Sequence, residues 1–273
     1  MEKPLRTCLA MLAILPLLAA CAGNPALHDG AAFMHSSATK AETQTADMFR
    51  TASAESRAVD IERKLMADER DKPAIARLSE ADFPQLVEPS TARKWAAMFA
   101  ALRAYTGALA RLTDPDLAAS VGTGLASVSA AVGTLADTPA MQGPLASLLR
   151  DFGTAVARAE TERKALTVIR ATDPAFGELV TGMAEALGDG DTTGLRGTVA
   201  DRWNAAALRS LSERYAELTR ANPSAVADRR DLASRYIGGL EARDAQQAEI
   251  AAIRARLLAL AQTHHDLASL KQE

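Results

Sequence analysis

Apolar side chains recur at three- and four-residue steps along most of this 273-residue chain, and Asp-Pro and Asn-Pro pairs divide them into segments. In the clearest segment, which follows Ser90, a good helix N-cap, they are Trp95, Met98, Phe99, Leu102, Tyr105, Leu109 and Leu112. Residues spaced in this way share one face of an α-helix. Runs of β-branched residues are absent, so the pattern predicts an all-α fold, a multi-helix bundle that can be elongated.

Proline and glycine residues mark the expected ends of these helices. The Asp-Pro pairs at 114–115 and 173–174 place an N-cap carboxylate before a proline at the first helical position, so each is expected to begin a helix. Pro144 is expected to begin another, and a further helix is expected from about Thr193 to Arg220. Gly188 is expected to end the helix that starts at 173–174, since glycine readily closes helices.

The last segment, Ser224 to Lys271, is expected to be a long, coiled-coil-like helix that can kink at Gly238-Gly239. Beyond these glycines an approximate heptad seam is formed by Leu240, Ile250, Ile253, Leu257, Leu260, His264 and Leu267. Ala245 and Gln247 weaken the seam in its middle. An antiparallel partner within the same chain is favoured over a homodimeric coiled coil.

The stretch Leu117–Ala136 contains no charged residue. A helix without a charged face needs neighbours on several sides, either at the centre of a soluble bundle or in a lipid bilayer. Small residues pack closely in both settings. Three glycines, many hydroxyl groups and the lack of bulky side chains favour the central helix over a membrane-inserting segment.

The start of the chain has the three parts of an export signal. Met1–Thr7 carries two positive charges, Cys8–Leu18 is an apolar run without charge, and two small residues follow. The apolar run is shorter than the roughly 20 residues that a transmembrane helix needs.

The sequence Leu18-Ala19-Ala20-Cys21 resembles the lipobox of bacterial lipoprotein precursors, with a leucine, two small residues and the cysteine. The resemblance covers only the start of the chain. It implies that residues 1–20 are a signal peptide removed before Cys21, and that Cys21 carries a diacylglyceryl group and an acylated amine, the modification that palmitate labels. The alternative is an ordinary secretory signal that leaves Cys21 free. Cys8 leaves with the signal, so Cys21 has no disulfide partner in the mature chain, which favours the lipid.

Two or three acyl chains anchor a protein stably in a bilayer, so the expected location is the bacterial cell envelope. Ala22 favours the outer membrane, facing the periplasm, because an aspartate at that position resembles an inner-membrane retention signal. Residues 21–37 are polar and non-periodic, and are expected to form a lipidated flexible tether. Residues 38–273 are expected to form the helical bundle domain, with a subdivision near 188–192 left open.

Composition and missing motifs narrow the function. The formal net charge is −3 at pH 7 and no basic block stands out, which argues against a nucleic-acid partner. The zinc motif His-Glu-x-x-His, the phosphate-binding loop and the Gly-x-Ser-x-Gly elbow are absent. Carboxylates are abundant, but no spacing singles out an acid and base pair. We therefore expect no enzyme, no cofactor and no metal.

Three weaker features have ordinary structural interpretations. His264 and His265 are adjacent and should point about 100° apart on a helix, so they are expected to offer charge near a helix C-terminus rather than to chelate one ion. Asp189–Gly194 partly resembles a calcium loop, but Ala200 stands where the last ligand belongs, so a turn between helices is expected. Trp95 and Trp203 are expected to anchor a core rather than line a pocket.

Three functions fit these observations. The favoured one is a membrane-anchored, non-enzymatic helical scaffold that binds another envelope protein, whose identity the sequence does not give. The second is a helical module that binds a lipid or another apolar small molecule between its helices. The third is a membrane-inserting or pore-forming protein that uses Leu117–Ala136.

Overall fold

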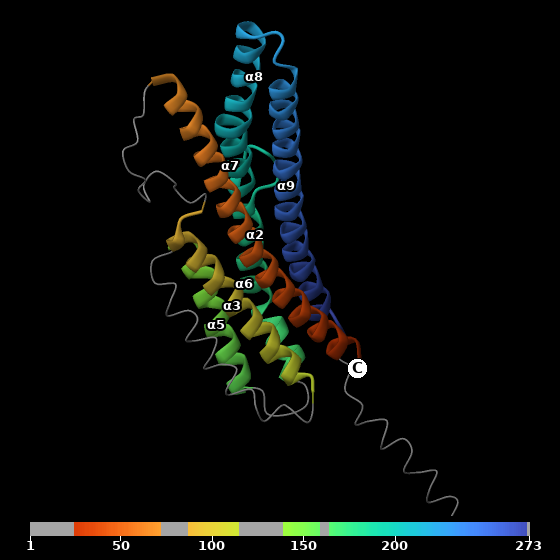
Figure 1. Ribbon diagram of the computed structural model, residues 1–273. Helices are drawn as coiled ribbons and strands as arrows, with labels where there is room; N and C mark the ends of the chain where they lie inside the picture. Colours follow the sequence, from red (N-terminus) through yellow and green to blue (C-terminus); the bar gives the residue numbers. More distant parts are fainter. Residues whose placement is uncertain (1–24, 72–86, 115–138, 159–163, 272–273) are drawn as a thin grey trace, which may run out of the picture. The chain divides into compact units, whose positions relative to one another are not determined.

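The computed structural model describes residues 25–71, 87–114, 139–158 and 164–271, which are helical apart from short connections (Figure 1). The elements are α2 (Pro25–Asp71), α3 (Pro89–Leu112), α5 (Pro139–Arg158), α6 (Lys164–Leu187), α7 (Gly194–Arg202), the π-helical η3 (Trp203–Leu208), α8 (Arg209–Ala221) and α9 (Val226–Ala268). No strand occurs within these ranges. The expected all-α, multi-helix bundle is therefore confirmed.

Three predicted features lie outside the described residues. They are the lipoprotein signal with Cys21, the helix expected to begin at Pro115, and the uncharged stretch Leu117–Ala136. Among the helices that are described, none combines the length and the hydropathy needed to span a bilayer.

The chain divides into two compact units, and four helices contribute to both. Unit 1 comprises Met1–Thr39, Ala100–Glu178 and Leu260–Glu273, and unit 2 comprises Lys40–Phe99 and Leu179–Ala259. None of these limits lies at 188–192, where the sequence left a subdivision open.

Unit 1 buries the apolar faces of five helices. Its largest side chains that are almost completely removed from solvent are Met34, Leu102, Tyr105, Leu109, Leu145, Leu148, Phe152, Ile169 and Phe176. On α3, α5 and α6 they follow one another at the three-, four- and seven-residue steps of one helical face. Burial of each such side chain contributes about 1.5–3 kcal/mol of transfer free energy, which makes this core the main source of stability of unit 1.

The beginning of α2 is part of this core, so the prediction of a flexible tether is wrong for residues 25–37. Ala31, Met34 and Ala38 are fully buried along one face of α2. A Cβ atom added at Gly30 would lie 2.7 Å from Leu267 Cδ2, which shows how closely α2 approaches the end of α9. Apart from Met34, this face consists of alanine and glycine, which carry little hydrophobic signal in the sequence but allow close helix packing.

Unit 2 is built around a second apolar cluster. Trp95 stacks on Phe99 with ring centroids 5.9 Å apart, and Phe49 and Trp95 form a T-shaped pair with centroids 6.4 Å apart. Trp203 is also buried, and its indole Nε1 donates to Gln246 Oε1 at 2.9 Å. Both tryptophans are therefore core residues, as the sequence predicted.

Prolines 144 and 174 do not begin helices, contrary to expectation. Pro144 lies inside α5, which begins with Pro139 at the position that prolines favour. Pro174 lies inside α6 and costs the helix a hydrogen bond to the carbonyl of residue 170. Buried residues on both sides, Ile169 and Phe176 among them, hold α6 in register despite that loss.

The heptad seam of α9 starts earlier than expected and is continuous. It steps by three and four residues through Leu232, Tyr236, Gly239, Arg243, Gln246, Ile250, Ile253, Leu257, Leu260, His264 and Leu267. The predicted seam begins at Leu240, one residue out of register, because the true positions just before Ile250 are Gly239, Arg243 and Gln246, which give no apolar signal. No break occurs at Gly238-Gly239. Instead, a Cβ atom at Gly239 would lie 3.1 Å from Leu208 Cδ2, so this glycine permits close packing of α9 on η3.

Candidate functional site

Two adjacent histidines of α9 share one carboxylate of α6 within unit 1. Nδ1 of His264 lies 2.8 Å from Oδ1 of Asp173, and Nδ1 of His265 lies 2.9 Å from Oδ2 of the same residue. The two oxygens of this single carboxylate therefore bridge the two imidazoles. Among the described residues no group of three His, Cys, Asp or Glu side chains is placed to hold a metal ion.

On the other side of its ring, His264 meets a pair of hydroxyl groups. Its Nε2 lies 2.7 Å from the hydroxyl oxygen of Tyr105 on α3, which lies 2.6 Å from Oγ1 of Thr172 on α6. Thr172 Oγ1 is also 2.8 Å from the carbonyl oxygen of Val168. We call the chain Thr172, Tyr105, His264 and Asp173 the buried relay.

Aromatic rings enclose the buried relay. Phe176 of α6 stacks on the His264 imidazole with centroids 4.3 Å apart and planes 18° from parallel. Tyr105 contacts Phe176 and Phe152, with centroids 5.2 and 5.3 Å away. The side chains of Tyr105, His264 and both phenylalanines are fully buried. These residues belong to the parts of α3, α5, α6 and α9 that lie in unit 1.

The setting perturbs the four titratable groups in different directions. Burial raises the pKa of the Tyr105 hydroxyl far above its usual range, and burial lowers the pKa of His264 although Asp173 opposes the shift. Burial disfavours the charged form of Asp173, but hydrogen bonds from His264 and His265 outweigh it and lower the pKa of the carboxyl. The exposed His265 has a raised pKa because of its hydrogen bond to Asp173. Near neutral pH, Asp173 is therefore a carboxylate and His264 a neutral imidazole.

The order hydroxyl, imidazole, carboxylate is also the order of a nucleophile, its base and the group that orients the base. Such a nucleophile must reach a substrate. The hydroxyl of Tyr105 is enclosed by protein and its pKa is raised, so in this conformation it is poorly placed to attack a substrate. The relay here connects α3, α6 and α9 through hydrogen bonds.

Arg170 fixes the end of α9 beside the relay. Its Nε donates to the carbonyl oxygen of Ala268 at 2.9 Å, and its Nη2 donates to the carbonyl of Leu270. The last carbonyl groups of a helix lack partners within the helix, and a cation there is electrostatically favourable. Asp173 and Arg170 of α6 thus hold α9 at the two histidines and at its end one turn later.

In unit 2, polar side chains of α9 form hydrogen bonds with α7 and η3. Gln247 Oε1 accepts from Arg196 Nε at 2.6 Å, and its Nε2 donates to the Arg196 carbonyl at 2.8 Å. Arg243 Nη1 donates to Asn204 Oδ1 at 3.0 Å. These bonds tie α9 to α7 and η3.

The loop that resembled a calcium site is a closed turn. Oγ1 of Thr193 donates to Asp189 Oδ1 at 2.8 Å, and Asp191 forms a 3.1 Å ion pair with Arg196. Gly188 has a φ of 88°, as a helix-ending glycine requires. The predicted turn and the helix end at Gly188 are both confirmed, and the carboxylates are occupied by other groups.

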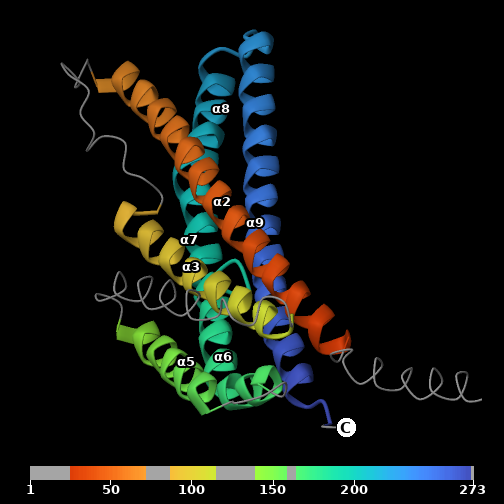
Figure 2. The ribbon, with the colours of Figure 1, turned by 90° about the horizontal axis from the view of Figure 1, so that it is seen from below.

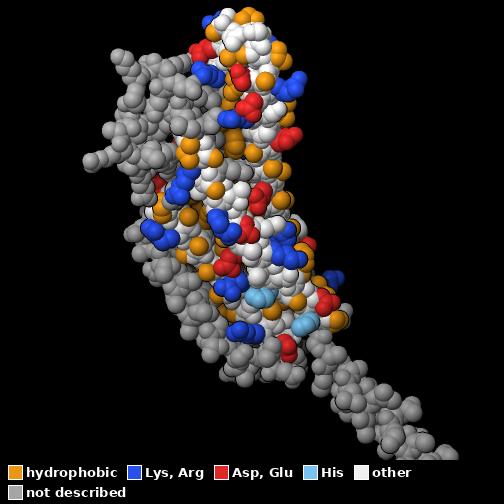
Figure 3. All heavy atoms as spheres, in the orientation of Figure 1, with side chains coloured by type: hydrophobic (Ala, Val, Ile, Leu, Met, Phe, Trp, Pro, Cys, Tyr) orange, Lys and Arg blue, Asp and Glu red, His pale blue; other side chains and the backbone are white. Residues whose placement is uncertain are grey.

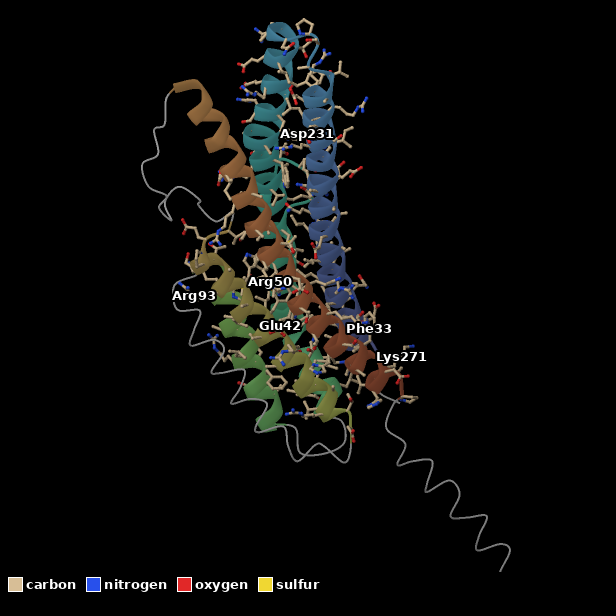
Figure 4. The ribbon with its side chains drawn as sticks, in the orientation of Figure 1. Phe33, Glu42, Arg50, Arg93, Asp231 and Lys271 are labelled. Atoms are coloured by element: carbon tan, nitrogen blue, oxygen red, sulfur yellow. The ribbon has the colours of Figure 1, made fainter. Side chains whose placement is uncertain are left out.

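Residues 209–237 form a largely exposed hairpin that we call the α8–α9 arm. Its helices run side by side in Figures 1 and 2, and only Leu211 and Leu232 are buried within it. Tyr215 is 41% exposed, and Val226 and Ile237 are each 54% exposed. Figure 3 shows acidic and basic side chains interspersed on it. Figure 4 shows Asp231 near its outer end.

Sequence reasoning found the histidine pair but not its partners. The proline that follows Asp173 predicts an N-cap role for this residue, and helical spacing predicts an apolar core position for Tyr105. One signal was available: a histidine on a heptad seam and a tyrosine on an apolar face both need buried hydrogen-bond partners. The lipobox residues Leu18, Ala19, Ala20 and Cys21 lie outside the described part of the chain.

Comparison of this chain with protein-family models, curated proteins and solved structures found no match.

Proposed function

We propose that this chain is a lipoprotein of the bacterial cell envelope, anchored through acylated Cys21, whose helical part is a non-enzymatic scaffold that binds another envelope protein. The anchor rests on the lipobox resemblance. The binding function rests on one structural observation, the α8–α9 arm.

The arm has the surface of a binding element. Three large apolar side chains, Tyr215, Val226 and Ile237, are exposed on a pair of helices that bury little of their own surface. The same two helices carry charged residues of both signs: Arg209, Glu213, Arg214, Glu217, Arg220, Asp228, Arg229, Arg230, Asp231 and Arg235. Protein interfaces combine apolar anchors with a polar rim in this way.

The turn at the end of the arm is well ordered by hydrogen bonds. Arg229 Nη2 donates to the carbonyl of Pro223 at 2.7 Å, and Ser224 Oγ donates to Asn222 Oδ1 at 2.7 Å. A preorganised surface loses less conformational entropy when it binds. This favours a scaffold that presents a fixed surface.

The potentially reactive groups of unit 1 support a non-enzymatic role. Tyr105 and His264 are fully buried, and each already has hydrogen-bond partners inside the protein. The exposed His265 is held by the same carboxylate.

Site-specific photo-cross-linking in intact cells tests the binding function. A photoreactive phenylalanine analogue replaces Tyr215 or Ile237 in the full chain, and Phe33 of α2, which is 52% exposed, serves as the control position. We expect the same discrete adduct from both arm positions and none from the control. The adduct should weaken when Ile237→Asp is combined with the probe at Tyr215. Absence of a shared adduct, or an equal yield at Phe33, would rule out the arm as the binding surface.

A further inference from the structure

Hydrogen atoms in the buried relay have one consistent arrangement when His264 is neutral. The Asp173 carboxylate only accepts hydrogen bonds, so Nδ1 of His264 carries the proton and donates to it at 2.8 Å. Nε2 is then an acceptor, and Tyr105 donates its hydroxyl proton to it at 2.7 Å. The Tyr105 oxygen accepts in turn from Thr172 Oγ1 at 2.6 Å. Every link of the chain holds one proton.

The same heavy atoms offer a second consistent arrangement when His264 is protonated. Both ring nitrogens now donate, Nδ1 to Asp173 and Nε2 to the Tyr105 oxygen. Tyr105 turns its proton toward Thr172 Oγ1, and Thr172 turns its own toward the Val168 carbonyl, which already lies 2.8 Å away. Each link again holds one proton, and the imidazolium forms an ion pair with the carboxylate.

We propose that the buried relay is a pH-responsive element of unit 1 that takes up one proton from solvent on His264 Nε2 by turning two hydroxyl groups, while its heavy atoms keep their positions. Burying an unpaired charge normally costs several kcal/mol, and a buried histidine that cannot be satisfied when charged is expelled by unfolding. This histidine has a carboxylate on one side and a reversible hydroxyl pair on the other. The inference does not depend on the proposed envelope function.

The groups that face His264 support this behaviour. Among the described residues, the titratable groups that hydrogen-bond to it are Tyr105 from α3 and Asp173 from α6, while its neighbour on α9, the exposed His265, binds the other oxygen of the same carboxylate. Phe176 contributes an apolar ring, and α5 contributes Phe152 behind Tyr105. The Asp173 side chain is 22% exposed and that of His265 is 65% exposed, so the relay meets solvent at its acidic end.

Nitrogen NMR of the four histidines tests the proposal directly. The full chain with ¹⁵N-labelled histidine is titrated from neutral to acidic pH, and near-UV circular dichroism follows its tertiary structure. Variants of His28, His35 and His265 assign the signals. We expect His264 to carry its proton on Nδ1 at neutral pH. It should then gain a second proton, on Nε2, with a pKa below about 6.5 while the dichroism stays native.

Two matched variants test the hydroxyl pair. Thr172→Val removes the acceptor that Tyr105 needs only in the protonated arrangement, so it should lower the pKa of His264 by about one unit or more. Thr106→Val is the control, since Thr106 is equally buried in unit 1 and its Oγ1 bonds only to carbonyls of its own helix. It should leave the pKa of His264 unchanged.

Three results would overturn the proposal. One is a neutral His264 protonated on Nε2, and another is a His264 that gains its second proton only as the native dichroism is lost. Both can be observed in the wild type, whatever the variants do. The third is an equal pKa of His264 in Thr172→Val and Thr106→Val.

Discussion

Replacing Tyr105 with phenylalanine isolates the contribution of one hydroxyl group to unit 1. The substitution keeps the ring contacts with Phe152 and Phe176 and removes only the oxygen that joins His264 to Thr172. Thr172 keeps its bond to the Val168 carbonyl, but Nε2 of the fully buried His264 loses its partner at neutral pH. Leaving one buried acceptor unsatisfied costs about 1–3 kcal/mol, so the free energy of unfolding should fall by that amount.

Urea denaturation followed by far-UV circular dichroism measures this change, because both units are helical. Tryptophan fluorescence is less suitable, since Trp95 and Trp203 both belong to unit 2. Tyr215→Phe on the exposed α8–α9 arm is the matched control, and should stay within about 0.5 kcal/mol of wild type. A Tyr105→Phe variant as stable as the control, with an unchanged denaturant slope, would refute the role given to this hydroxyl.

Three further predictions concern other parts of the chain. The hydrogen bond to Asp173 raises the pKa of His265, so the pair stabilises the fold below the unfolded pKa of about 6.5 and loses that effect as pH rises through the folded pKa. In urea titrations, His265→Gln should therefore lower the free energy of unfolding more at pH 6 than at pH 8. An equal loss at both pH values would contradict this. Gly188→Ala should lower the melting temperature through a cost of about 1–3 kcal/mol, because φ is 88° and the added Cβ would lie 2.0 Å from the Thr193 carbonyl oxygen; Gly190→Ala, with open space around it, should be nearly neutral. Cys21→Ala should abolish palmitate labelling and release the protein from sedimenting membranes, and identical behaviour of both proteins would disprove the lipid anchor.

The helical class and most buried helix faces could be predicted from the sequence, because large apolar residues recur along them at helical spacing. Trp95, Leu102 and Leu109 recur at helical spacing and are buried as predicted. The start of α2 was missed because its buried face consists of Ala31, Met34 and Ala38, and alanines also occur on exposed surfaces. The start of α2 is buried because the helices approach one another closely there, not because its side chains are large.

The candidate site was missed for a different reason. The proline after Asp173 predicts a helix cap, which already explains this carboxylate from its neighbours in the sequence. Its partners in the structure, His264 and His265, lie more than ninety residues away. Proline inside a helix is normally disfavoured, so only tertiary packing could reveal that α6 continues through Pro174. Long-range pairing of this kind leaves no periodic signal.

The polar residues on the seam of α9 make its alignment unique. A purely apolar seam presents nearly the same surface after a slide of one heptad, roughly 10 Å along the helix axis. Such a slide would move Gln246 away from the Trp203 indole in unit 2 and His264 away from Tyr105 and Asp173 in unit 1. Each displaced group would be left buried beside hydrocarbon, at a cost that no apolar contact restores. Gln246 and His264 thus fix the position of α9 along its axis.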